Sequence, residues 1–143
     1  MIQEDKDKIL KEFIKNFIQK DRRERSYSEL ISSKKRGQFS DRLNHNWESV
    51  LDMRYLTLID NETDNPDNIQ KELGFKDNEL CYVISDYRDY DDKFLPFKEV
   101  FAEIYSRGFA TILINMTADI LFLETERLGK YGARFIGKLI KRQ

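Results

Sequence analysis

Apolar residues recur at helical spacing in the first third of the chain. Six of them lie three or four positions apart: Ile9, Leu10, Phe13, Ile14, Phe17 and Ile18. This pattern predicts an amphipathic helix over residues 4–20 with one broad buried face. A second set shares a helical face in the same way: Phe39, Leu43, Trp47, Val50 and Leu51. It predicts another long helix over residues 39–53.

The pattern changes to that of strands in the second half. Residues 109–126 hold two apolar runs, 111–114 and 120–123, on either side of a polar turn. They predict a β-hairpin whose strands are covered on both faces. Residues 80–84 and 133–140 are also typical of strands. Residues 55–59 are short enough to form either a strand or an extended connector.

Two shorter helices are marked by their ends. Asn65-Pro66 is typical of a cap followed by proline at the first helical position, which predicts a helix over 66–73. Pro96 and Gly108 bound a predicted helix over 96–107, and residues 85–93 form an acidic loop before it.

A helix of this length between the strands at 80–84 and 109–114 favours a parallel pair with a right-handed crossover. The second half then runs strand, helix, strand, strand, strand. We therefore expect one α+β domain over residues 1–143, with N-terminal helices packed on a mixed sheet of about four strands.

Charge is segregated along the chain although the net charge is only −1. Residues 1–45 hold 12 basic and 8 acidic residues, residues 60–99 hold 5 and 12, and residues 127–143 hold 6 and none. Either the basic ends fold back onto the acidic middle, or they form a basic patch for a nucleic acid or an acidic protein.

The chain begins MIQEDKDK, which does not resemble a secretory signal, and no apolar run is long enough for a membrane helix. A single cysteine, Cys81, fits a reducing cytoplasm. Because Cys81 lies in an apolar strand, we expect a buried thiol of low reactivity.

Several motifs fall short of the chemistry that they suggest. Residues 132–138 have the spacing of a phosphate-binding loop, but Leu139 stands where the loop needs Ser or Thr. Asp41, His45 and Ser49 share one exposed helix face, without an oxyanion hole. A calcium-loop frame that begins at Asp89 also fails. The sequence therefore predicts no cofactor and no metal site.

The best ligand candidates depend on the parallel pair. If it forms, the carboxyl ends of both strands meet at one edge. That edge would gather Asp86, Asp89, Asn115 and Asp119. Glu124 and Glu126 would lie at the opposite end. A small-ligand or metal-dependent enzyme at this edge is one functional alternative.

A second alternative is nucleic-acid binding through two basic clusters, which no recognised motif accompanies. The clusters contain Arg22, Arg23 and Arg25, and Lys34, Lys35 and Arg36. The leading hypothesis is a cytoplasmic, non-enzymatic module that binds a protein partner. One version is an immunity-like protein whose acidic segment, residues 60–99, covers a basic toxin surface.

Overall fold

The structure, a computed structural model, describes residues 2–60, 62–105, 107–125 and 133–139. The α-helices are α1 (Ile2–Phe17), α2 (Arg23–Leu30), α3 (Arg36–Val50), α4 (Pro66–Leu73) and α5 (Phe97–Ile104). The strands are β1 (Leu56–Leu58), β2 (Leu80–Ser85), β3 (Lys93–Pro96), β4 (Thr111–Asn115), β5 (Ile120–Glu124) and β6 (Arg134–Lys138). Short 3-10 turns cover Lys20–Arg22 and Met53–Tyr55.

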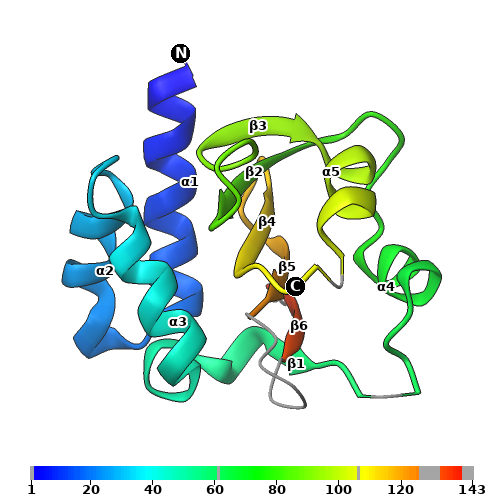
Figure 1. Cartoon of the computed structure of the whole chain (residues 1–143), viewed down its shortest axis with the longest axis horizontal. Coiled ribbons are helices and arrows are strands. Elements are labelled where there is room, and N and C mark those ends of the chain that lie inside the picture. Colours follow the sequence, from blue (N-terminus) through cyan, green and yellow to red (C-terminus); the bar gives the residue numbers. More distant parts are fainter. Residues whose placement is uncertain (1, 61, 106, 126–132, 140–143) are drawn as a thin grey trace.

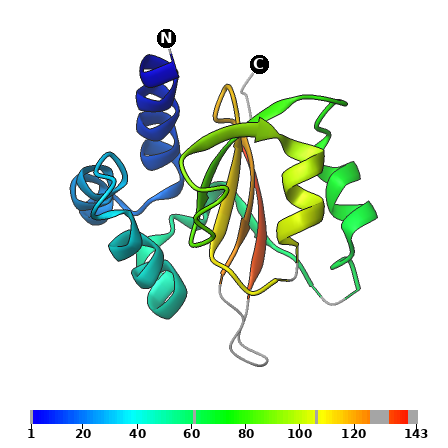
Figure 2. The ribbon, with the colours of Figure 1, turned by 45° about the horizontal axis from the view of Figure 1, so that its top comes forward.

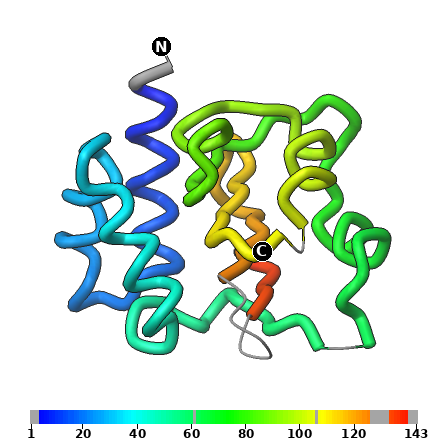
Figure 3. Tube along the Cα trace, viewed as in Figure 1, coloured from blue at the N-terminus to red at the C-terminus, as the bar shows by residue number. Residues whose placement is uncertain are grey.

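The six strands form one antiparallel sheet in the order β1-β6-β5-β4-β2-β3. Helices α1, α2 and α3 lie on one side of this sheet, and α4 and α5 lie on the other (Figures 1 and 2). The chain crosses between the two sides through the stretch that contains β1 (Figure 3). β1 is therefore both a connector and an edge strand.

Strand alternation fills two separate hydrophobic cores. On β4, Ile112 and Ile114 pack with the N-terminal helices, whereas Leu113 packs with α4 and α5. Successive side chains of a strand point to opposite faces, so a strand that is apolar at every position contributes to both cores. This explains why residues 109–126 are apolar on both faces.

Much of the predicted architecture is confirmed. The structure has N-terminal helices, a β4–β5 hairpin, a helix over Pro66–Leu73 capped by the Asn65 side chain, and a last strand within residues 133–140. The helix predicted over 39–53 begins earlier, at Arg36, and is interrupted at Asn46, whose φ of −154° is not helical.

The prediction of a mixed sheet of about four strands was wrong, because the sheet has six strands and all its pairs are antiparallel. Residues 93–96, assigned to the acidic loop and the next helix, form strand β3, which pairs with β2 as a hairpin. This extra strand reverses the chain, so β4 returns antiparallel to β2 and not parallel to it. Ser85 therefore faces Thr111, and Cys81 faces Asn115.

Where the structure describes them, basic residues of both ends pair with acids of the middle segment. Arg36 binds Asp91, Lys6 binds Asp92 at 2.9 Å, and Arg134 binds Asp64. Because these ion pairs connect distant segments, part of the charge segregation stabilises the fold.

Candidate functional site

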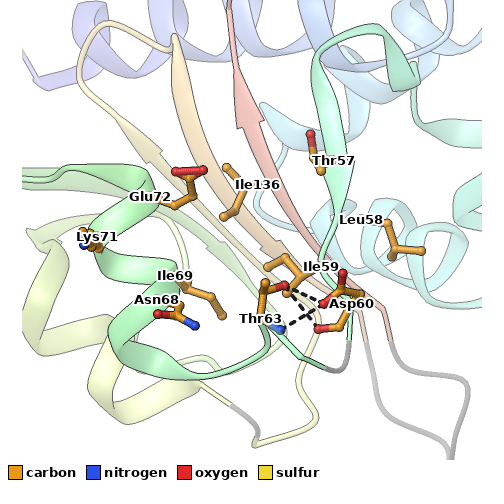
Figure 4. Close-up of a pocket in the computed structure, with 10 residues that line it drawn as sticks. All are labelled: Thr57, Leu58, Ile59, Asp60, Thr63, Asn68, Ile69, Lys71, Glu72 and Ile136. Carbon is orange, nitrogen blue, oxygen red and sulfur yellow. Dashed lines mark hydrogen bonds between the residues drawn. The ribbon is translucent and has the colours of Figure 1, made fainter.

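A groove lies beside β1, on the face of the sheet that carries α4 and α5. Helix α4 contacts β5, and α5 contacts β3 and β4. The same face of β6 and β1 is left partly open. The groove has a volume of about 550 Å³ and lies between β1, β6 and α4 (Figure 4). This volume is typical of ligand-binding clefts.

Three isoleucines from different elements form the apolar floor of the groove. Ile59 follows β1, Ile69 belongs to α4 and Ile136 belongs to β6, and all three project into the same space (Figure 4). Ile69 is buried, whereas Ile59 and Ile136 are half-buried. The floor is thus buried on its helix side and partly accessible on its sheet side.

The groove continues past Ile136 along β6. A smaller extension of about 310 Å³ is lined by Arg54, Tyr55 and Lys138. Glu72 borders both parts, and its carboxylate lies 3.9 Å from the Lys138 ammonium. The walls are therefore polar and charged while the floor is apolar.

The end of the groove beside β1 is acidic. The Asp60 carboxylate accepts hydrogen bonds from the backbone N–H and the hydroxyl of Thr63, both at 2.9 Å, and from the N–H of Glu62 at 3.0 Å. The bonds from Thr63 are the main cause of the lowered pKa of Asp60. Residues 60–70 contain four acidic residues and no basic one, although Asp64 is paired with Arg134 and Lys71, the next residue, also lines the groove. This end of the groove favours a cationic group.

Sequence reasoning missed the groove because its residues are isolated in the sequence. Ile59, Ile69 and Ile136 come from three separate elements that are brought together only by the order of the strands. The one local signal was the apolar, strand-like composition of residues 55–59 beside an acidic loop.

Two of the predicted ligand residues close the β4–β5 turn. The Asn115 amide donates to the Asp119 carboxylate at 2.7 Å, and its carbonyl oxygen accepts the N–H of Asp119 and of Ile120. The Thr117 hydroxyl donates to the same carboxylate at 2.7 Å. These bonds stabilise a tight turn, which is the structural role typical of Asn and Asp.

The other two predicted residues lie at the opposite end of the strands. The N–H of Asp86 donates to the Ala110 carbonyl, before β4 begins, and the Asn44 amide donates to the Asp86 carboxylate at 3.3 Å. Asp89 is exposed, and its carbonyl oxygen accepts from Lys93. The antiparallel pairing thus separates Asp86 and Asp89 from Asn115 and Asp119.

The prediction that Glu124 lies at the end of the strands opposite to Asp86 was also wrong. It lies opposite Thr111, which lies opposite Ser85, so all three are at one end of the sheet. The Arg134 guanidinium donates to the Glu124 carboxylate at 2.5 Å and also binds Asp64. It lies 4.7 Å above the Tyr105 ring, and the Tyr105 hydroxyl donates to Asp64. Glu126 lies outside the described residues.

This buried cluster has the character of a structural ion-pair network. Burial lowers the pKa of Arg134, but the hydrogen bond and the charge of Glu124 and the charge of Asp64 raise it overall. Desolvation, followed by the bond to Asp64, raises the pKa of Tyr105 to about 12. Arg134 therefore stays charged and Tyr105 stays protonated at neutral pH, and the cluster fixes the loop before α4 to β6.

The two predicted basic clusters are not one continuous surface. Arg36 is buried and bound to Asp91, and Arg23 donates to the Ile18 carbonyl. Arg22 is half-buried. Arg25 is exposed and lies 3.5 Å from Glu29, which also binds Arg42. Lys34 and Lys35 are the members that point freely into solvent among the described side chains.

The remaining motifs have structural explanations. Asp41, His45 and Ser49 lie on α3, but the break at Asn46 interrupts their helical face, and the Ser49 hydroxyl donates to the Asn46 carbonyl. Gly137 of the phosphate-loop pattern lies within β6, and Gly132 lies outside the described residues. Within the described ranges, no group of three or more His, Cys, Asp or Glu side chains is arranged to hold a metal ion.

Comparisons with protein-family models, with curated proteins and with solved structures found no match to the chain. Among the residues with a described structure, no helix is long and apolar enough to span a membrane.

Proposed function

We propose that the protein is a binding module that acts through a protein partner, and that the groove between β1, β6 and α4 is its interaction site. The observation that carries this proposal is an apolar floor of three isoleucines within a charged rim, whose acidic end is formed by Asp60. An apolar centre surrounded by polar residues is the usual composition of a protein interface.

The shape of the groove favours a polypeptide over a small molecule. The two parts of the groove share Thr57, Glu72 and Ile136 and together follow the sheet edge from Asp60 toward Lys138. An elongated, open surface of this kind suits a segment of chain that lays several side chains along it.

The immunity-like version is one form of this proposal. Several acids of residues 60–99 are engaged internally, since Asp64, Glu72, Asp77, Asp91 and Asp92 all form ion pairs with basic residues of the chain. Asp60, Glu62 and Asp67 are exposed close to the groove. A basic protein surface would therefore be recognised through the acidic end of the groove and not through the whole acidic segment.

Neither alternative function has comparable support. Enzymatic use of one edge by Asp86, Asn115 and Asp119 required a parallel pair, and the strands are antiparallel. Nucleic-acid binding would depend mainly on Lys34 and Lys35, because Arg36 is buried. Nucleic-acid binding stays a prediction, and its signature would be an affinity for nucleic acid that falls steeply as the salt concentration rises.

Capture from native lysate tests the proposal with matched variants. Ile136→Glu places a charge on the floor of the groove, whereas Ala102→Glu adds the same charge on the exposed side of α5. We expect the wild type and the Ala102→Glu protein to capture the same partner and the Ile136→Glu protein to lose it. Absence of any specific partner, or equal capture by both variants, contradicts the proposal, provided that both variants fold.

A further inference from the structure

We propose that an extended segment of the protein partner adds to the sheet as a new strand beside β1, with the side chains of one of its faces directed toward the groove. This inference rests on the proposed function and specifies how the partner binds. The occupant is a segment with apolar side chains at alternate positions and a basic residue beside Asp60.

The hydrogen bonds of β1 give the first argument. The Ile59 N–H donates to the Arg134 carbonyl at 2.8 Å, and the register places Thr57 opposite Ile136. In an antiparallel pair, the N–H and C=O groups of alternate residues point toward the partner strand. Those of Thr57 and Ile59 therefore face β6, while the N–H and C=O of Leu58 point away from it, toward the open side of the sheet.

The two edges of the sheet differ in how they are protected. β3, at one edge, carries the exposed Lys93 and also Pro96, which has no N–H to donate. Lysine and proline are the residues with which proteins prevent strand addition at an edge. β1, at the other edge, reads Leu56-Thr57-Leu58 and carries neither residue. β1 is therefore the edge that is suited to accept a strand.

The side chains around β1 set the apolar pattern of the occupant. The Leu58 side chain is 54% exposed and, by strand alternation, points to the face of the sheet opposite to that of Thr57 and Ile59. Ile59 and Ile136 line the groove on the other face. An added strand alternates its side chains between these two faces and contacts apolar surface on both.

The charges near the end of β1 indicate which charged residue the bound segment should carry. The chain leaves β1 directly into residues 60–70, where Asp60, Glu62 and Asp67 are exposed acids, Asp64 is paired with Arg134, and the nearest basic lining residue of the groove on this side is Lys71. The Asp60 carboxylate is held at the groove by Thr63. A lysine or arginine of the occupant that lies at this end gains electrostatic attraction, whereas an acidic residue is repelled.

Peptide display tests the inference without knowledge of the natural partner. A library of random peptides is selected on the full chain, and the affinities of selected peptides are compared between Leu58→Pro and Leu58→Ala. Both substitutions shorten the side chain, but only proline removes the outward N–H, and it leaves the bonds to β6 intact. We expect selected peptides to alternate apolar residues with Lys or Arg. We expect Leu58→Pro to bind them roughly tenfold more weakly than Leu58→Ala, the effect of one lost hydrogen bond.

The other outcomes separate the two proposals. Equal binding by Leu58→Pro and Leu58→Ala, together with loss in Ile136→Glu, overturns strand addition and leaves the groove as the site. Failure to select any peptide that depends on Ile136 overturns both. A concentration-dependent dimer that Leu58→Pro abolishes overturns the partner segment in favour of a second copy of this chain. Should Leu58→Pro unfold, slower exchange of the Leu58 amide on peptide binding supports strand addition in the wild type, and unchanged exchange overturns it.

Discussion

The guanidinium of Arg36 forms a two-pronged ion pair with the carboxylate of Asp91, with bonds of 2.9 Å from Nε and 2.8 Å from Nη2. The same guanidinium donates to the Leu30 carbonyl and to the Tyr82 hydroxyl. Only 6% of the Arg36 side chain is exposed. The pair thus connects the start of α3 to the loop before β3, and with it the N-terminal helices to the sheet.

Removal of Arg36 is expected to destabilise the fold strongly. Arg36→Ala leaves Asp91 and Tyr82 without their buried partner, and the loss of one member of a buried ion pair costs about 3–5 kcal/mol. Urea denaturation measures the change in the free energy of unfolding. Lys35→Ala, at the exposed neighbouring position, should stay within about 0.5 kcal/mol of the wild type. A similar small loss for Arg36→Ala would show that the pair does not hold the two parts together.

Acid is expected to weaken the same junction through Asp92. Burial raises the pKa of Asp92, but hydrogen bonds from Tyr82 and Lys6 and the charge of Arg36 lower it overall. A carboxyl whose pKa is lower in the folded state contributes stability above its unfolded pKa of about 4, and this contribution is lost as the pH falls through the folded value.

The free energy of unfolding should therefore fall as the pH drops below about 4, and Asp92→Asn should make this fall less steep. The matched control is Asp89→Asn, at an exposed position of the same loop, which should keep the wild-type slope. Denaturation across the acid range gives the slopes. Identical slopes for Asp92→Asn and the wild type would contradict the role given to this carboxylate.

Replacement of two glycines by alanine is expected to change the stability of the protein in opposite directions. A Cβ at Gly137 would lie 2.8 Å from Leu121 Cγ and 2.9 Å from Phe17 Cε1, so β6 can approach α1 only where the side chain is absent. Gly137→Ala should cost about 1–3 kcal/mol. Nothing lies within 4 Å of the corresponding position at Gly37 in α3, and Gly37→Ala should stabilise the protein by about 0.5–1 kcal/mol. Equal effects in thermal unfolding would contradict the close packing at Gly137.

Local sequence patterns predicted most elements of the fold but not the direction of its strands. The periodicity of α1, the cap of α4 and the apolar β4–β5 hairpin are strong local signals. Strand β3 has four residues, follows an acidic loop and contains proline. Its pairing with β2 is a non-local property, and once it is missed every later strand direction is reversed.

Cys81 should be nearly unreactive in the folded protein. Burial, and secondarily the charge of Glu79, raise the pKa of its thiol to about 12. At pH 8 only about one thiol in ten thousand is then ionised, and the thiolate is the reactive form. We expect labelling by a thiol reagent to be roughly a thousandfold slower than in urea-unfolded protein. Equal labelling rates would show that the thiol is exposed.

The roles predicted for individual residues from the sequence agree with the structure only where their partners are close in the sequence. Asn115 and Asp119 were ligand candidates, but they lie in the polar turn predicted between the two apolar runs and bond to each other within it. Arg36 was assigned to a basic patch because its partner, Asp91, is distant in the sequence. For the groove, Ile136 carried no signal and Ile59 only the strand-like composition of residues 55–59, because the groove exists only once β6 lies beside β1.

Hydrogen–deuterium exchange of the protein with its captured partner tests the proposed interaction site most directly. We expect slower exchange in the segments that form the groove, namely β1 with Ile59, α4 and β6. The β4–β5 turn at Asn115–Asp119 and the exposed lysines, Lys34 and Lys35, should exchange as in the free protein. Protection of either of those segments, with unchanged exchange in β1 and α4, would show that the partner binds elsewhere.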